Sequence, residues 1–212
     1  TFELASQATK LGLLYPPDPS SWKESTLGGN VAECAGGPKG VKYGITRNFV
    51  LGLEVVLPDG SVIETGNAVD GDMCGPDWTM LITGSEGTLG LITAITLRLV
   101  QPPQVKKTIL AIYANLEDAA NTVSKTMAVG IVPATLEIMN DQTIVAVEKY
   151  LHIGLPVEAG GLLLVEVDGM VSAVEENSKR IEKICKECGA TEVKIAQTVA
   201  EVEGLWKARR AV

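Results

Sequence analysis

Three glycine-bearing stretches in the first half of the chain have residue types suited to holding a phosphate or a flat ring. They are residues 26–37 (TLGGNVAECAGG), 42–47 (KYGITR) and 84–90 (GSEGTLG). Because glycine has no Cβ, its backbone can approach such a group closely and turn its N–H groups towards it. Any one stretch taken alone is better explained by bulges and turns in an irregular sheet.

Prolines and hydroxyl groups precede the first stretch. Residues 16–21 (PPDPSS) form a rigid lead-in, and Ser25 and Thr26 precede the glycine pair at 28–29. These hydroxyl and backbone donors suit both a pyrophosphate and the polar edge of an isoalloxazine ring. The third stretch leads into a predicted strand at residues 91–100, whose entrance offers main-chain groups to an adenine or ribose. Together the stretches indicate a flavin dinucleotide pocket made of loops.

Motifs for other chemistries are missing. The sequence has no G-x-G-x-x-G opening a helix and no G-x-x-x-x-G-K-[ST], so neither a Rossmann site nor a P-loop is supported. Residues 84–87 (GSEG) lack the G-x-S-x-G spacing, and a single histidine, His152, is a thin basis for a catalytic triad. We interpret His152 as a structural or surface residue, and we expect no catalytic residue and no metal site within this chain.

Cys185 and Cys188 form a C-x-x-C pair, which raises the question of redox or zinc chemistry. A capping box at Ser172 and an apolar stripe predict a helix over residues 172–188, with the pair at its C-terminus. Redox cysteines of the thioredoxin type instead use a helix N-terminus, where the dipole favours the thiolate. No second Cys or His pair completes a zinc site. We therefore predict buried or half-buried structural thiols.

The composition is that of an ordinary globular protein. The 212 residues are 46% hydrophobic and carry a formal net charge of −8. An acidic chain is a poor partner for nucleic acid, since backbone phosphates require a basic face. The first ten residues do not have the pattern of a signal peptide, and the apolar runs are far shorter than the ~20 residues that span a bilayer. We therefore expect a soluble, cytoplasmic protein without a membrane span.

The elements that must position these residues change character at residues 101–104 (QPPQ), where we place a domain boundary. Before it, glycine-rich connections join predicted strands, two of which form a hairpin through residues 58–60 (PDG). After it, strands and helices alternate, which predicts an α+β layer of ferredoxin-like character. The predicted elements are strands at 50–57, 61–65, 90–100, 107–114, 133–139, 161–167 and 192–196, and helices at 1–11, 116–129, after Asn140, 172–188 and from Thr198 onward.

Taken in order, the glycine stretches resemble a known family. Residues 26–37, 42–47, 50–60 (VLGLEVVLPDG) and 83–93 (TGSEGTLGLIT) are similar to the FAD-linked oxidases of the vanillyl-alcohol oxidase superfamily. Within that superfamily, the similarity is to the group that contains the glycolate oxidase D subunit and D-lactate dehydrogenase. The resemblance covers most of residues 15–101 and implies FAD as the cofactor.

The same resemblance implies an α+β architecture with two parts. Residues 1–101 would be the second lobe of a PCMH-type FAD-binding domain, and residues 105–212 would be part of a ferredoxin-like cap domain that covers the substrate. The family's preceding glycine-rich loop and its later histidine-rich segment, which supplies the general base and in many members a metal site, are missing, and residues 70–74 (DGDMC) also depart from the pattern. We therefore expect a fragment of a longer flavoenzyme with little or no turnover of its own.

The resemblance also assigns site residues. Arg209, in the segment 205–210 (LWKARR), matches the arginine that binds the substrate carboxylate, and a guanidinium suits this bidentate interaction. Without the resemblance, Arg209 would be a solvated cation at a helix end. The implied cofactor-binding residues are Pro17, Ser21, Ser25, Thr26, Gly28, Gly29, Asn30, Ala35, Gly36, Gly37, Tyr43, Gly44, Glu86, Gly87, Thr88, Gly90 and Ile92.

The activity implied for the parent enzyme is oxidation of a D-2-hydroxy acid, of the glycolate or D-lactate type, to the 2-oxo acid. Hydride would move from the substrate α-carbon to N5 of the flavin. Electron-transfer subunits or further copies of the chain are the expected protein partners. A different class of function stays open: a non-catalytic ligand-binding or assembly module that pairs through unpaired strand edges of its ferredoxin-like half.

Overall fold

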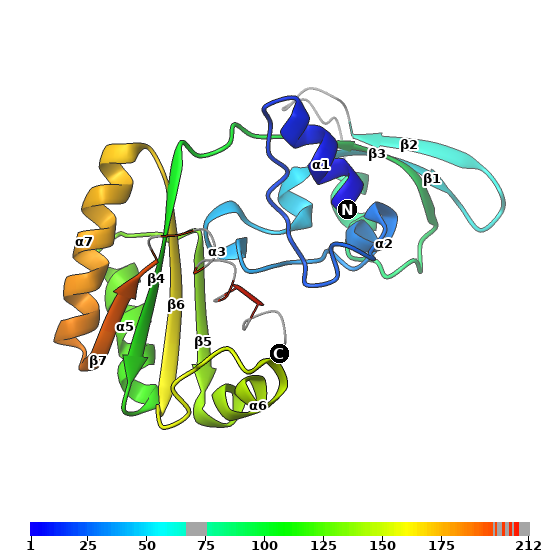
Figure 1. Ribbon diagram of the computed structural model, residues 1–212. Coiled ribbons are helices and arrows are strands. Elements are labelled where there is room, and N and C mark those ends of the chain that lie inside the picture. The colour runs from blue at the N-terminus through cyan, green and yellow to red at the C-terminus, as the bar shows by residue number, and fades with distance from the viewer. Residues whose placement is uncertain (67–75, 197, 199–200, 202–203, 205, 208–212) are drawn as a thin grey trace. The chain divides into compact units, whose positions relative to one another are not determined.

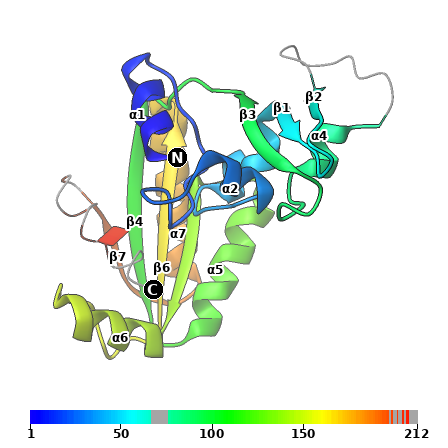
Figure 2. The same cartoon turned by 90° about the vertical axis from the view of Figure 1, so that its right-hand side faces the viewer.

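In the computed structural model, the chain folds as two compact units, Thr1–Pro102 (unit 1) and Pro103–Val212 (unit 2). The structure describes residues 1–66, 76–196, 198, 201, 204, 206 and 207. The helices and strands of each unit can be followed in two views (Figures 1 and 2). Within these described residues, no helix combines the length and apolar character that crossing a membrane requires.

Unit 1 contains a three-stranded antiparallel sheet. Its strand order is β2–β1–β3, with β1 at Val50–Val56, β2 at Val62–Gly66 and β3 at Leu91–Leu97. Asp59 Oδ1 accepts hydrogen bonds from both the amide and the hydroxyl of Ser61, which closes the turn between β1 and β2. The predicted hairpin is therefore confirmed.

Short helices pack around this sheet. Val31 and Ile82, from two of them, join Leu53 and Val55 of β1 in one buried apolar cluster. The cluster forms on one face because side chains alternate between the two faces of a strand. The helical segments of unit 1 are α1 (Phe2–Lys10), α2 (Leu27–Ala32), α3 (Gly40–Tyr43), the 3-10 turn η1 (Thr46–Phe49) and α4 (Trp78–Ile82).

Unit 2 is built on a four-stranded antiparallel sheet in the order β5–β6–β4–β7. With its helices it follows the βαββαβ pattern, so the predicted ferredoxin-like fold is confirmed. Helices α5 and α7 cover one face of the sheet, and α6 lies between β5 and β6 in the chain (Figure 1). The elements are β4 (Val105–Tyr113), α5 (Leu116–Ala128), β5 (Thr135–Asn140), α6 (Asp141–Leu151), β6 (Gly161–Gly169), α7 (Val171–Glu187) and β7 (Ala190–Ile195).

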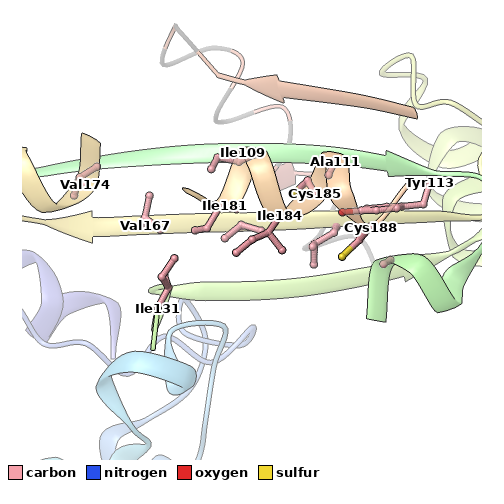
Figure 3. Close-up of a cluster of buried hydrophobic side chains, with 13 residues drawn as sticks. Ile109, Ala111, Tyr113, Ile131, Val167, Val174, Ile181, Ile184, Cys185 and Cys188 are labelled. Atoms are coloured by element: carbon pink, nitrogen blue, oxygen red, sulfur yellow. The ribbon is translucent and has the colours of Figure 1, made fainter. Parts of the chain in front are cut away.

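The main core of unit 2 lies between the sheet and α7 (Figure 3). Ile109 of β4 and Ile181 of α7 are both fully buried there, together with Tyr113. Cys185 and Cys188 belong to the same cluster and are 0% and 8% exposed, which confirms the prediction of structural thiols. Burial raises the pKa of the Cys185 thiol, which disfavours the thiolate that redox or metal chemistry needs.

Side-chain caps set the start of two helices in unit 2. Asn115 Oδ1 accepts from the Asp118 amide, and Asn140 Oδ1 accepts from the Thr143 amide, both at 2.9 Å. Such caps satisfy amides that have no acceptor inside the helix. The helices predicted to follow Asn115 and Asn140 are accordingly confirmed.

The helix start predicted at Thr198 and the capping box predicted at Ser172 have different outcomes. Thr198 and Glu201 form both reciprocal hydrogen bonds, amide to carboxylate at 3.3 Å and amide to hydroxyl at 3.2 Å. The box predicted at Ser172 is wrong, because α7 begins at Val171 and its N-cap, Met170, makes no side-chain hydrogen bond. Ser172 therefore lies inside the first turn, where its hydroxyl cannot occupy the cap position.

Candidate cofactor site

The glycine pair of the first stretch lies in a helix, so the expected pocket made only of loops is wrong at this point. Thr26 is the N-cap of α2, and its Oγ1 accepts a hydrogen bond from the Gly29 amide at 3.0 Å. The first N–H groups of a helix have no acceptors within it. The first turn of α2 contains no acidic residue. The Gly29 amide is thus satisfied by the cap, which leaves the amides of Leu27 and Gly28 for an anionic or polar group.

Some side chains before and within α2 are held by hydrogen bonds, whereas others are exposed. Ser25 Oγ and Thr1 Oγ1 lie 2.9 Å apart, and the Asn30 side-chain amide donates to the same Thr1 oxygen. Asn30 is 5% exposed, and its side-chain amide is engaged by Thr1. Ser21 and Thr26 are exposed residues, and the Thr26 hydroxyl oxygen accepts from the Gly29 amide.

The third glycine stretch docks on the C-terminal end of α2. The amides of Gly84 and Glu86 donate to the carbonyls of Val31 and Ala32, each at 2.9 Å. Glu86 adopts a φ of +54° and Gly87 one of +75°, which turns the backbone sharply beyond this contact. The structure therefore brings the first and third stretches together, as their joint interpretation requires.

Near the start of β3, two glycines differ in the space around them. A Cβ on Gly28 would meet the Ile92 carbonyl oxygen at 3.5 Å, an ordinary contact. A Cβ on Gly90 would lie 2.6 Å from a methyl of Val55 in β1, so Gly90 is needed for strand packing. Thr88 uses its hydroxyl to bond the Ser85 carbonyl at 2.6 Å, which closes the exposed turn before it.

The segment of Pro17 packs directly against the end of the first stretch. A Cβ on Gly37 would lie 2.5 Å from the Asp18 carbonyl oxygen, so only glycine permits this approach. Asp18 also forms an ion pair with Lys39, at 3.4 Å. Pro17 itself is buried. The segment after Pro17 and the end of the first stretch are therefore closely packed against each other.

The second stretch makes similar structural contacts. The Ala35 carbonyl accepts hydrogen bonds from the amide and the hydroxyl of Thr46, and a Cβ on Gly36 would lie 3.2 Å from the Ile45 side chain. Gly44, which follows Tyr43 at the end of α3, has a φ of +88° and lies against the Asn48 side chain. All seventeen residues assigned to the cofactor lie in unit 1, although they differ in how open they are.

The available groups of unit 1 fit FAD. They combine the exposed residues Ser21 and Thr26 with the backbone amides of Leu27 and Gly28 at the start of α2. Hydroxyl and amide donors next to glycine are the groups that bind a diphosphate and the polar edge of an isoalloxazine ring. The donor set therefore supports the predicted cofactor on chemical grounds.

Two predictions lie outside the described residues, and one polar residue was missed. Arg209 and residues 70–74 are not among those the structure describes. Glu166, in the middle of β6, is only 3% exposed and was not singled out from the sequence. Its signal is visible in retrospect, because a charged residue interrupts an otherwise apolar buried run at 161–167.

Comparison with family models covers both units. Residues 102–212 match the model described as FAD linked oxidases, C-terminal domain. Residues 1–66 match the model described as FAD binding domain. The second match contains the first and second glycine stretches and all of α2.

Similar proteins of known name extend along the whole chain. Glycolate oxidase subunit GlcD of Bacillus subtilis is 48% identical over 211 residues, which cover 100% of this chain and 45% of the relative. A D-lactate dehydrogenase of Anaerostipes hadrus is 38% identical over 217 residues, covering 99% of this chain and 46% of the relative. The chain thus spans about half the length of the curated relatives it matches.

Solved structures share the fold at lower identity. An alkyldihydroxyacetonephosphate synthase superimposes with a TM-score of 0.76 and 23% identity, over 99% of this chain and 41% of that one. A p-cresol methylhydroxylase gives a TM-score of 0.70 and 17% identity, over 98% and 45%. The match of the C-terminal-domain model to more than half of the chain, together with the FAD-binding match, shows that the chain belongs to the FAD-linked oxidases, whose cofactor is FAD.

Proposed function

We propose that this chain is part of a flavoenzyme that oxidises a D-2-hydroxy acid, of the glycolate or D-lactate type, to the 2-oxo acid. The observation that carries the proposal is the 48% identity to a glycolate oxidase subunit along the whole chain, through both units. The similarity to a D-lactate dehydrogenase over 99% of the chain supports the same substrate class. Both named substrates are small 2-hydroxy acids.

In this proposal unit 1 is the second lobe of the FAD-binding domain. The hydroxyl of Thr26 and the first amides of α2 hold the diphosphate and the flavin edge, and the 84–92 segment supports them from the C-terminal end of that helix. FAD, when bound, supplies the acceptor for the hydride that leaves the substrate α-carbon. The remaining cofactor residues shape the backbone that presents these donors.

Unit 2 is, in this proposal, part of the cap domain over the substrate. Arg209 binds the substrate carboxylate through its planar guanidinium, which gives both affinity and orientation. The general base belongs to a part of the enzyme that these 212 residues do not include, so the chain by itself has little or no turnover. The similarity to a glycolate oxidase subunit supports electron-transfer subunits as partners.

The decisive experiment uses the whole enzyme that contains this sequence. Under anaerobic conditions, glycolate or D-lactate should remove the absorbance of the oxidised flavin, whereas L-lactate should not. Arg209→Lys should raise KM for the acid by about tenfold or more, because one bidentate charged contact is lost. The adjacent Arg210→Lys is the matched control and should change KM little.

The outcomes separate the proposal from its alternative. A purified protein that binds no FAD and reduces no flavin with any 2-hydroxy acid contradicts the proposal and favours a non-catalytic module. Flavin reduction by L-lactate but not D-lactate would overturn the assigned stereochemistry while leaving the oxidase intact. Equal KM changes for Arg209→Lys and Arg210→Lys would reject the assignment of the carboxylate to Arg209.

A further inference from the structure

A buried carboxylate lies on the face of the unit 2 sheet that α5 and α7 do not cover. Leu163, Val165 and Val167 of β6 point into the core beneath those helices, so the alternating Glu166 points to the opposite face. Glu166 is 3% exposed. Burying a carboxylate is costly unless it is paired and hydrogen-bonded, so its partners indicate what it is for.

Polar residues of the neighbouring strands form a row with Glu166. Thr108 of β4 and Thr135 of β5 are its direct partners across the antiparallel ladders, so the three side chains share one face. The Thr108 hydroxyl donates to Glu166 Oε2 at 3.4 Å. The Thr135 hydroxyl is buried, and among the described residues it has no hydrogen-bond partner. The row is therefore polar where the neighbouring positions of β6 are apolar.

The contact from furthest along the chain comes from Trp206. Its indole Nε1–H donates to Glu166 Oε2 at 3.3 Å, across 40 residues of sequence. The indole nitrogen is a donor only, so the direction of this hydrogen bond is fixed. Lys106 Nζ lies 3.7 Å from the same oxygen, but its side chain is 58% exposed, which makes it a weaker partner. Glu166 Oε2 therefore contacts Thr108 and Lys106 of β4 and Trp206, which follows β7 in the chain.

We propose that Glu166 is a positioning residue that anchors Trp206 to the sheet and through it supports substrate binding by Arg209. Trp206 precedes Arg209 by three residues in the sequence. The proposal rests on the proposed function for the role of Arg209, although the Glu166 to Trp206 contact does not. Strand β6 supplies a rigid support, because it is hydrogen-bonded to strands on both sides.

The first test measures the anchor itself in the 212-residue chain. The chain has three tryptophans, Trp22, Trp78 and Trp206, so 15N-labelled tryptophan gives three indole signals, and Trp206→Phe identifies the third. Glu166→Leu should shift that signal and speed exchange of its proton with solvent. Glu166→Gln keeps an acceptor oxygen and should have a smaller effect. An unchanged Trp206 signal in Glu166→Leu would overturn the anchor.

The second test measures the consequence in the whole enzyme. Trp206→Phe keeps an aromatic ring and removes only the donor, so it should raise KM for the hydroxy acid about tenfold with kcat changed less than about twofold. Glu166→Leu should do the same, and the double variant should be no worse than either single one. Trp78→Phe, in unit 1 and 53% exposed, is the matched control.

The combined results distinguish the two proposals. If the wild-type enzyme oxidises no 2-hydroxy acid, the proposed function fails, and the indole signals still decide whether Glu166 holds Trp206. If the enzyme is active but Trp206→Phe leaves KM within about twofold of wild type, the positioning role is rejected. A loss confined to kcat would reject it too. If Glu166→Leu does not fold, Glu166→Gln and Trp206→Phe carry the test, with partial and full effects expected respectively.

Discussion

At the scale of single residues, the glycines of the first stretch have two different tasks. Gly37 packs closely against the backbone of Asp18, because a Cβ added at Gly37 would lie 2.5 Å from the Asp18 carbonyl oxygen. Gly28 lies in α2 with ordinary space around it, 3.5 Å from the Ile92 carbonyl oxygen. The sequence presents both as glycines of one motif. Packing makes Gly37 necessary for the fold, whereas Gly28 has room for a side chain.

This difference predicts opposite effects of the same substitution. Gly37→Ala should lower the free energy of unfolding by about 1–3 kcal/mol, because neither backbone segment can yield without strain. Gly28→Ala should leave stability unchanged or raise it by up to about 1 kcal/mol, because alanine favours the helix. Denaturant unfolding measures both.

FAD affinity is the second readout for this pair. If the first turn of α2 faces the cofactor, Gly28→Ala should weaken FAD binding although it does not destabilise the protein. A Gly28→Ala protein that binds FAD as tightly as wild type would remove Gly28 from the site. A Gly37→Ala protein of wild-type stability would show that the contact with Asp18 relaxes easily.

At the scale of elements, local signals locate most of unit 2 but not the short helices of unit 1. Asn115, Asn140 and the turn at residues 58–60 act through hydrogen bonds within a few residues, so their elements are readable from sequence. Helices α2 and α4 have side-chain caps too, Thr26 and Asp77, but they are only six and five residues long. Helices this short depend on packing against the sheet, which sequence pattern alone does not reveal.

One carboxylate, that of Glu148, holds the loop that follows α6. Glu148 accepts hydrogen bonds from the amides of Leu155 at 2.8 Å, Gly154 at 3.0 Å and Ile153 at 3.2 Å. The hydrogen bonds from Leu155 and Gly154 are the main reason that the pKa of Glu148 lies below its ordinary value. His152, exposed at the C-cap of α6 with a φ of +51°, begins this loop, as its interpretation as a surface residue predicts.

The direction of this pKa shift predicts a pH dependence. A depressed carboxyl pKa contributes stability that is complete above the ordinary glutamate pKa of about 4.3 and is lost as pH falls through the folded value. Glu148→Gln should therefore be less stable than wild type near neutral pH, with the difference shrinking in acid. Unfolding followed from neutral pH to pH 3 measures it, with the exposed Glu158→Gln as control. A constant difference across that range would contradict this account.

At the scale of the whole molecule, the two units have separate buried clusters. Val31, Leu53 and Ile82 belong to unit 1, and Ile109 and Ile181 to unit 2. All residues assigned to the cofactor lie in unit 1, and Glu166 with Trp206 lies in unit 2. Cofactor binding and substrate positioning are therefore proposed for different units of the same chain.

This division predicts which residues FAD binding protects from hydrogen exchange. Titration of the chain with FAD should give saturable binding, and hydrogen exchange should slow in residues 21–37 and 84–92 but not in the β4–β6 sheet. Ligand that binds only the folded state stabilises the residues it contacts. Absence of binding at millimolar FAD would leave only common ancestry with flavoenzymes, and protection confined to unit 2 would contradict the assigned site.

The sequence by itself determined the cofactor class, the hairpin at residues 58–60 and the ferredoxin-like second half, because each depends on local turn chemistry, periodicity or a resemblance carried by contiguous residues. Only the tertiary structure decided that Gly84 binds Val31 and that Glu166 meets Trp206, contacts that join residues 53 and 40 positions apart. Such contacts depend on strand register and on which faces pack together. Those are properties of the assembled sheet, which no short segment specifies.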